Sequence, residues 1–292
     1  FKSIPSDIFF LFLHSKNIQE VNKKLKFMKL NFWKYQSSGN DFVIIKELQN
    51  IDTKHIAALC DRRFGIGADG LMLVNCNDEG SFNISFFNSD GSTDTLCGNG
   101  SLCAVDFANE HFKLQSNKFF ASDGEHTFYK GNLCKYQISF NNCTPPLKKE
   151  PSQPLIINNR HHTGYFINTG SPHYIVFNDD IDDIDIGSIG KRLRHDTSIN
   201  REGSNVDFVK VETPCTLKIR TFERGVEAET LGCGTGSVAA AITHCFHNIH
   251  SEDNSFDITI NNKGGYHQIT LSMKDGIISD IRLGGNPKMV FK

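Results

Sequence analysis

The sequence predicts an α+β protein of two pseudo-symmetric domains, each a curled, mostly antiparallel sheet around a central helix. Two observations indicate a duplication. The phrase TLCGNGS at 95–101 returns as TLGCGTGS at 230–237, and SGNDFV at 38–43 returns as GSNVDFV at 203–209. Self-similarity at so long a period indicates two related domains rather than a solenoid. The third observation is that each half contains many short strand patterns and about one long helix pattern.

The elements of the first half follow from alternation, caps and turns. Thr53, near the N-cap, begins an expected helix over 53–60. The glycine-rich GIGADG at 65–70 is a turn that leads into a strand. The apolar run 102–108, after the first cysteine phrase, predicts the central helix. The expected strands are 31–35, 41–46, 71–74, 82–87, 118–121, 126–129 and 135–140.

The second half begins after segment 144–154, which holds four of the eight prolines. Because proline breaks both helices and sheet ladders, this segment is the expected linker. Helices are expected over 186–194, after an acidic turn, and over 238–242, after the second cysteine phrase. The expected strands are 165–168, 174–177, 206–211, 217–222, 256–260, 266–272, 277–283 and 289–291. The domains are therefore expected at 28–143 and 155–283, with 284–292 returning as a strand to the N-terminal domain.

Composition excludes several classes of protein. The formal net charge of the 292 residues is −2, and no basic stripe or acidic tail is present, so no nucleic-acid partner is expected. The apolar run 8–13 is far shorter than a membrane span, and no signal-peptide cleavage pattern follows it, so no membrane partner is expected. Met28 opens the first strand pattern and is the expected functional start, with 1–27 a disordered or non-native extension.

The nine cysteines contain no CxxC pair, so no metal site is expected. We expect their thiols to be free, in a reducing cytoplasm. Seven of them have the apolar or strand-like neighbours of small buried hydrophobic residues. These seven are Cys60, Cys76, Cys103, Cys134, Cys143, Cys215 and Cys245. Cys97 and Cys233 differ, because glycines flank them at expected helix starts.

A thiol at a helix N-terminus lies at the positive end of the helix dipole, so its pKa is expected to fall. The first backbone N–H groups of the helix have no intrahelical acceptor and suit a carboxylate. Two such helices facing one small carboxylate substrate would let one thiolate remove an α-proton while the other thiol adds a proton to the opposite face. This arrangement predicts stereochemical inversion by two bases, in an active site between the domains, with the carbanion stabilised by oriented dipoles.

Two other interpretations of the cysteine phrases remain open. The phrase around Cys233 lacks the lysine of a phosphate-binding loop, which counts against nucleotide binding. A redox disulfide between Cys97 and Cys233 is the second alternative, and we interpret it as a side reaction that inactivates the site.

At these residues the chain resembles the diaminopimelate epimerase family, over about 28–292. The resemblance depends on eight motifs in matching order. They are GNDF at 39–42, GIGADG at 65–70, FNSDGS at 87–92, CGNG at 97–100, GSPH at 170–173, NVDFV at 205–209, RTFERG at 220–225 and CGTG at 233–236.

The resemblance implies a function and a set of site residues. Cys97 and Cys233 would be the acid–base pair, with His173 and Glu223 close to the thiols. The backbone amides around Gly98, Asn99, Gly234 and Thr235 would hold the carboxylate at the reacting carbon. The substrate's other polar groups would be recognised by Asn40, Asn88, Asn205, Glu223 and Arg224, with Arg224 bidentate on the distal carboxylate. Ser171 stands where many members have a substrate-binding asparagine, and segment 225–232 is one residue longer than the common form.

Each side chain also has an ordinary structural alternative. Asn40, Asn88 and Asn205 suit turns in which the side chain binds its own backbone. His173 would then be a loop histidine and Arg224 a surface arginine. Asp69 and Asp90 are assigned to loop geometry alone.

The implied reaction is cofactor-independent epimerisation of LL- to meso-diaminopimelate by a cytoplasmic homodimer. The nearest alternative is a racemase or epimerase of proline, hydroxyproline or histidine on the same fold. Arg224 and the several asparagines favour a substrate with a second amino-acid group. A fold relative that isomerises without cysteines, and a non-enzymatic thiol or binding protein, are the remaining alternatives.

Overall fold

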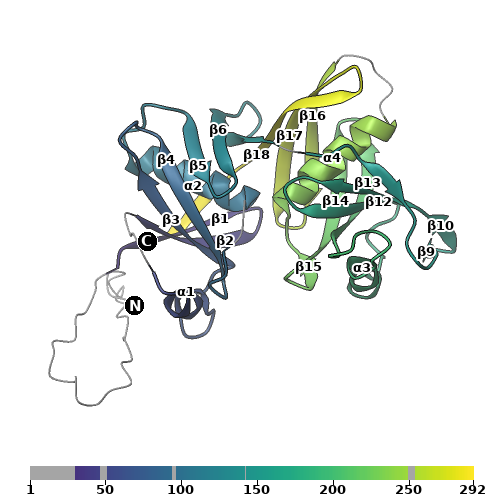
Figure 1. Cartoon of the computed structure of the whole chain (residues 1–292), viewed down its shortest axis with the longest axis horizontal. Coiled ribbons are helices and arrows are strands. Elements are labelled where there is room, and N and C mark those ends of the chain that lie inside the picture. The colour runs from purple at the N-terminus through teal and green to yellow at the C-terminus, as the bar shows by residue number, and fades with distance from the viewer. Residues whose placement is uncertain (1–29, 47–50, 94–96, 142, 249–253) are drawn as a thin grey trace, which may run out of the picture.

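The computed structural model describes residues 30–46, 51–93, 97–141, 143–248 and 254–292. Two lobes lie side by side, and each surrounds one long helix with strands (Figure 1). The expected extension 1–27 and start at Met28 lie outside the described residues. Of the helices in the described ranges, none is long and apolar enough to cross a membrane.

In the described residues, the first half forms two helices and seven strands. The strands are β1 (Phe32–Ser37), β2 (Asn40–Lys46), β3 (Gly70–Cys76), β4 (Phe82–Asn88), β5 (Lys118–Ala121), β6 (Gly124–Lys130) and β7 (Tyr136–Phe140). The helices are α1 (Thr53–Cys60) and α2 (Gly98–His111). The N-cap of α1 is Asp52 rather than Thr53, because the Asp52 carboxylate accepts the N–H of Lys54.

The second half has the helices α3 (Ile186–Arg194) and α4 (Gly234–Asn248). Its strands up to α4 are β8 (Leu147–Lys149), β9 (Leu155–Ile157), β10 (Arg160–His162), β11 (Gly164–Asn168), β12 (Pro172–Phe177), β13 (Asn205–Thr213), β14 (Thr216–Glu223) and β15 (Ala228–Thr230). Four strands follow α4: β16 (Asn254–Asn262), β17 (Gly265–Lys274), β18 (Ile277–Gly285) and β19 (Lys288–Phe291).

Strand pairing repeats between the halves. From β1 to β7 the neighbours pair in sequence order, antiparallel except for the parallel pairs β2–β3 and β4–β5. The series β11, β12, β13, β14, β16, β17, β18 has the same pattern, with parallel pairs β12–β13 and β14–β16. The long helices α2 and α4 occupy the same place in each series. The predicted two-domain α+β fold is confirmed.

The cysteine phrases coincide with this repeat, because each precedes the long helix of its half. The second pair of phrases, at 38–43 and 203–209, does not coincide with the repeat. Asn40 begins β2, whereas Asn205 begins β13, and β13 is the counterpart of β3. The echo between 38–43 and 203–209 is therefore wrong as evidence of duplication. Short Gly-Asn phrases recur because tight turns favour these residues.

The halves exchange strands and share one sheet. Antiparallel pairing of β7 with β18 joins them, with Ile138 opposite Leu283. After β7 the chain enters the second half, where β8 pairs with β11, and after β18 it returns to the first half, where β19 pairs with β1. The proline-rich segment 144–154 is thus more than a linker. Its prolines stand before and after β8, where no ladder hydrogen bond needs their missing N–H.

The helices α2 and α4 lie in the core and are longer than expected. The first eleven residues of α2 are buried, including the polar side chains of Asn99, Ser101 and Asp106. A helix enclosed by its sheet is apolar on all sides, so its ends are hard to recognise from periodicity. The strands β8, β9, β10 and β15 were not expected, because a three-residue strand depends on its partner more than on its own pattern.

None of the nine cysteines, all of which are described, forms a disulfide. Of the seven expected to be buried, Cys60, Cys103, Cys134 and Cys245 are buried and Cys143 is half-buried. The expectation is wrong for Cys76 and Cys215, which are exposed, one at the end of β3 and the other in the turn between β13 and β14.

Candidate active site

The first turns of α2 and α4 meet at two glycines. A Cβ added to Gly98 would lie 3.6 Å from the Cα of Gly234 and 2.5 Å from Leu283 Cδ2. A Cβ added to Gly234 would lie 3.4 Å from the Cα of Gly98. Leu283 Cδ2, 2.5 Å from the added Cβ of Gly98 and 2.9 Å from that of Gly234, leaves no room for a side chain at either glycine. The positive ends of both helix dipoles therefore converge on one place.

A cleft of about 690 Å³ opens at this place, between the two halves. It is lined by loops and strand ends of both halves and by the N-termini of α2 and α4. Cys97 precedes α2 on one side, and Cys233 precedes α4 on the other. Both thiols therefore face the same space, at the start of their helices.

Cys97 is the N-cap of α2 and is half-buried. Its Sγ accepts the N–H of Gly100 at 3.4 Å, and the thiol donates to Asn40 Oδ1 at 3.6 Å. The orientation of that amide is set by Asp69, because Asn40 Nδ2 donates to Asp69 Oδ2 at 2.7 Å. Arg62 in turn donates to Asp69 and to Asp41. A charged network on the first half thus holds the amide beside Cys97.

Cys233 lies deeper, with 6% of its surface exposed. Its Sγ accepts the N–H of Gly236 at 3.4 Å and lies 3.2 Å from Thr235 Oγ1. Burial, and next the carboxylates of Glu223 and Asp207, raise the pKa of the Cys233 thiol well above its usual range. The two hydrogen bonds act in the opposite direction but are outweighed. The expected fall in the pKa of this thiol is therefore wrong, because burial and neighbouring carboxylates outweigh the helix end.

His173 on β12 contacts Thr235, two residues after Cys233, and is fully buried. Its Nδ1 is 2.6 Å from Asp207 Oδ2, and its Nε2 is 2.9 Å from Thr235 Oγ1. Asp207, on β13, is also fully buried. Because β12 and β13 are parallel, with His173 opposite Asn205 and Ile175 opposite Asp207, the two side chains approach across neighbouring strands.

Asn205 organises the other polar groups of the second half. Its Oδ1 accepts the backbone N–H of Arg224 at 2.7 Å. Its Nδ2 donates to Ser171 Oγ at 2.9 Å and to the carbonyl of Pro172. The Glu223 carboxyl stands beside Arg224 at the end of β14, and burial raises its pKa.

His267 on β17 connects the two helices below the cleft. Its Nε2 lies 2.9 Å from Asn99 Oδ1, and its Nδ1 lies 2.8 Å from Ser237 Oγ and 3.2 Å from Asn262 Nδ2. The side chain is fully buried, and burial lowers the pKa of His267 to about 4. A neutral imidazole therefore joins the first turns of α2 and α4.

The cleft brings together all but one of the side chains and amides expected at the site. Those in its lining are Asn40, Asn88, Cys97, Gly98, Asn99, Ser171, Asn205, Glu223, Arg224, Cys233, Gly234 and Thr235. His173 is the exception, since it lies behind Thr235 rather than in the lining. Segment 225–232 contains the three-residue strand β15, which pairs with β14, and Leu231 after it lines the cleft.

Sequence reasoning missed four residues. The assignment of Asp69 to loop geometry alone is wrong, because Asp69 lines the cleft and binds Asn40. For Asp90 the same assignment is consistent with the structure, since its carboxylate accepts the N–H of Ser92. Arg62 also lines the cleft. An acidic residue inside an apolar strand was a usable signal for Asp207, since a buried charge needs a partner. His267 had no comparable signal.

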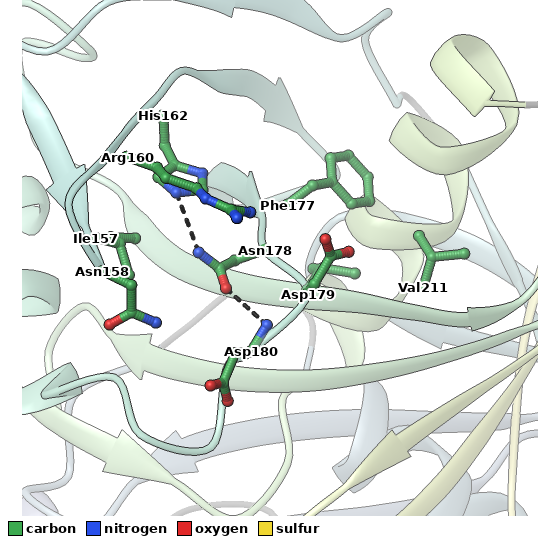
Figure 2. Close-up of a pocket in the computed structure, with 10 residues that line it drawn as sticks. Ile157, Asn158, Arg160, His162, Phe177, Asn178, Asp179, Asp180 and Val211 are labelled. Carbon is green, nitrogen blue, oxygen red and sulfur yellow. Dashed lines mark hydrogen bonds between the residues drawn. The ribbon is translucent and has the colours of Figure 1, made fainter.

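A second hollow, of about 380 Å³, lies on the second half between the β9–β10 hairpin and the ends of β12 and β13. His162 Nε2 is bonded there to Asn178, which accepts the N–H of Asp180 (Figure 2). No cysteine lines this hollow, whereas Cys97 and Cys233 both line the cleft. In the described ranges, no group of three or more His, Cys, Asp or Glu side chains is placed to hold a metal ion.

Comparison with known proteins gives one consistent result. The family model described as diaminopimelate epimerase matches residues 32–125 and 165–288. The diaminopimelate epimerase of Flavobacterium psychrophilum is 37% identical over 271 residues, which cover 90% of this chain and 99% of that relative. The diaminopimelate epimerase of Aquifex aeolicus is 38% identical and covers 73% of this chain and 80% of that relative.

Solved structures show the fold at much lower identity. A phenazine biosynthesis protein of the PhzF family from Bacillus anthracis has a TM-score of 0.71 at 13% identity and covers 90% of this chain and 98% of its own. A hydroxyproline epimerase from Agrobacterium vitis has a TM-score of 0.58 at 11% identity, covering 88% and 90%.

Proposed function

Because the chain belongs to the diaminopimelate epimerase family, and is thus an isomerase, we propose that Cys97 and Cys233 are the two bases that convert LL- to meso-diaminopimelate. One observation carries this proposal. Two thiols at the starts of two equivalent helices face one cleft, at the point where Gly98 and Gly234 bring the helices together. A carbon atom held between them is accessible to sulfur from opposite sides.

The converging helix ends account for binding of the reacting carboxylate. The first N–H groups of each helix have no intrahelical acceptor, and both dipoles present their positive ends. We propose that the amides of Gly98, Asn99, Gly234 and Thr235 bind this carboxylate. The same donors would stabilise the negative charge that develops on the carboxylate when the α-proton leaves.

The proton inventory of the reaction is balanced without a cofactor. One cysteine thiolate takes the α-proton and becomes a thiol, while the opposite thiol gives its proton to the other face of the carbon and becomes a thiolate. The raised pKa of Cys233 makes it the thiol of the pair in this state of the protein. After one turnover the two sulfurs have exchanged protonation states. In either direction of the reaction, the α-carbon therefore lies between one base and one acid.

The remaining polar side chains suit the distal amino-acid group of the substrate. We assign the distal carboxylate to Arg224, whose guanidinium forms bidentate pairs, and the neighbouring polar groups of the substrate to Asn40, Asn88 and Asn205, which line the same cleft. Glu223 is available for the ammonium groups, and Ser171 holds the Asn205 amide in place. Proline or hydroxyproline has no second amino-acid group to use this set.

We also propose that the enzyme acts in the cytoplasm as a homodimer and supplies lysine and peptidoglycan precursors. The dimer proposal is supported by an apolar strip on β19, where Met289, Val290 and Phe291 are about half exposed. Among the described strands, only β1 pairs with β19, so its outer side is available to a second copy.

Proton NMR in D2O tests the proposed function. Reduced wild-type protein is expected to remove the α-proton signal of LL-diaminopimelate and to form the meso isomer. Cys97→Ala and Cys233→Ala are expected to form no meso product, while Cys215→Ala, which changes an exposed thiol away from the cleft, should act like wild type. An unchanged α-proton signal with wild-type protein would disprove the proposal, and proline, hydroxyproline and histidine would be the next substrates.

A further inference from the structure

Four side chains form a continuous chain of short contacts that ends at Cys233. Cys233 Sγ lies 3.2 Å from Thr235 Oγ1, which lies 2.9 Å from His173 Nε2, and His173 Nδ1 lies 2.6 Å from Asp207 Oδ2. His173 and Asp207 are fully buried, and 9% of Thr235 is exposed. The function proposed above uses the Cys233 thiol and the backbone amide of Thr235 but gives no role to the side chains of Thr235, His173 and Asp207.

The surroundings of His173 determine which nitrogen carries the proton. Asn205 Oδ1 accepts the N–H of Arg224, so its amino group faces His173 Nε2, at 3.3 Å. The two hydrogens of this amino group are donated to Ser171 Oγ and to the Pro172 carbonyl, so the tautomer is set by the group at Nδ1. Asp207 accepts at both oxygens, from Thr221 Oγ1 at 2.7 Å and from His173 Nδ1. The proton of the neutral ring therefore lies on Nδ1, between the ring and the carboxylate.

This tautomer sets the direction in which protons can move along the four side chains. With Nε2 unprotonated, the Thr235 hydroxyl donates to it, and the Thr235 oxygen is then an acceptor for the Cys233 S–H. The Cys233 proton can pass to Thr235 Oγ1 while the Thr235 proton passes to His173 Nε2. The products are a thiolate and an imidazolium, with no change in total charge, and the buried Asp207 carboxylate stabilises the imidazolium.

We propose that Asp207 is a positioning residue of this enzyme, which holds His173 as the Nδ1–H tautomer so that Nε2 can accept the Cys233 proton through the Thr235 hydroxyl. This inference rests on the proposed function, because it concerns the thiol that must act as acid in one direction and as base in the other. Cys233 needs such help, since it is buried beside two carboxylates.

The titratable groups around the four contacting side chains, from Cys233 to Asp207, come from four parts of the fold. Asp207 belongs to β13 and Glu223 to β14, and Arg224 follows directly. Asp69, just before β3, acts on Glu223, and Cys97 lies across the cleft at the start of α2. Of these, Asp207 alone contacts the His173 ring in the described part of the chain. Asp207 therefore acts on Cys233 in two opposite ways, because its carboxylate raises the pKa of the thiol directly and, through His173, stabilises the group that accepts the thiol proton.

The first test needs no substitution. Nitrogen-15 NMR of the histidine rings in the reduced full-length protein distinguishes the two tautomers, with His173→Gln used to assign the signal. We expect the Nδ1–H form for His173. An Nε2–H ring in the wild-type protein would overturn the proposal.

The second test measures the ionisation of Cys233 without substrate. In a Cys97→Ala background, the alkylation rate of Cys233 by iodoacetamide is followed against pH by mass spectrometry of the peptide that contains it. Because loss of the Asp207 carboxylate by itself lowers the pKa of Cys233, Asp207→Asn is compared in proteins with His173 and with His173→Gln. We expect Asp207→Asn to move the midpoint about one pH unit further upward when His173 is present, which corresponds to about tenfold slower alkylation below the midpoint. The matched control is Asp106→Asn, the same change at a buried aspartate of α2 that pairs with Lys135.

Turnover separates this inference from the proposed function. With Cys97 present, Asp207→Asn is expected to lower kcat about tenfold or more and to leave KM within about twofold. The same midpoint change with and without His173, together with an unchanged kcat in Asp207→Asn, would overturn the positioning role even if the wild type epimerises diaminopimelate. Absence of turnover in the wild type would instead refute the proposed function. The His173-dependent change in the alkylation midpoint of Cys233 would still support the contact series from Asp207 to Cys233.

Discussion

Acidification should weaken the junction between the two halves through His267. The imidazole is fully buried between Asn99 and Ser237, and burial lowers its pKa from the usual 6.5 to about 4. The unfolded chain takes up a proton below about pH 6.5, whereas the folded protein does so only near pH 4. The free energy of unfolding therefore keeps its full value, as far as His267 is concerned, above pH 6.5, and it decreases as the pH falls toward 4.

The size of this loss follows from the two pKa values. Each pH unit between them lowers the free energy of unfolding by about 1.4 kcal/mol, which gives about 3 kcal/mol over the whole window and about 2 kcal/mol by pH 5. His244, His247 and His111 also have lowered pKa values because of burial, so the wild-type curve alone does not isolate His267.

The assay is urea unfolding at pH 7 and pH 5, followed by the fluorescence of Trp33, which is the single tryptophan and packs on Phe107. His267→Gln removes the titrating group and keeps an amide that can bond to Asn99. We expect the wild type to lose about 2 kcal/mol more than His267→Gln between these pH values. The control is His161→Gln at an exposed position, which should follow the wild type. Equal losses in wild type and His267→Gln would refute the reasoning.

Three further predictions concern the cleft. Gly98→Ala should abolish most activity and cost about 1–3 kcal/mol in urea unfolding, because its Cβ would lie 2.5 Å from Leu283 Cδ2, and Leu283→Ala should restore part of both. Thr235→Val should lower kcat about a hundredfold in steady-state assays, whereas Thr235→Ser, which keeps the hydroxyl, should stay within about tenfold of wild type; equal losses would exclude a role for the hydroxyl. Arg224→Lys should raise KM for diaminopimelate about tenfold or more with little change in kcat, because a bidentate pair is lost; an unchanged KM would place the distal carboxylate elsewhere.

Much of the fold and of the cleft lining could be predicted because the signals are local. A cysteine followed by glycines before an apolar run describes a helix start in a few residues, and both cysteines stand at such starts. The contacts behind the thiols are not local. Asp207 is 34 positions from His173 and meets it only because β12 and β13 are parallel neighbours. His267 joins Asn99 to Ser237 across the junction, and nothing in its own strand indicates this.

The same distinction explains the incorrect predictions. Helix position alone suggested a lowered pKa for Cys233, but burial and the carboxylates of Glu223 and Asp207 come from other elements and raise it. The strand β8 exists because the two halves exchange strands, and its own three residues carry no pattern strong enough to show it. Whether a short segment pairs depends on what the rest of the fold places beside it.

The duplicated fold and the proposed reaction have related but unequal symmetry. Inversion at one carbon needs a base on each side, and two equivalent helices provide two equivalent starting positions. The substrate is not symmetric about that carbon, because its distal group must bind in the same place for both isomers, and Arg224, Glu223 and Asn205 all come from the second half. The thiol of that half therefore has carboxylates and His173 around it, whereas Cys97 faces the amide of Asn40. Thiols in such different surroundings should ionise unequally, so α-proton exchange in D2O should begin at different rates from LL- and from meso-diaminopimelate.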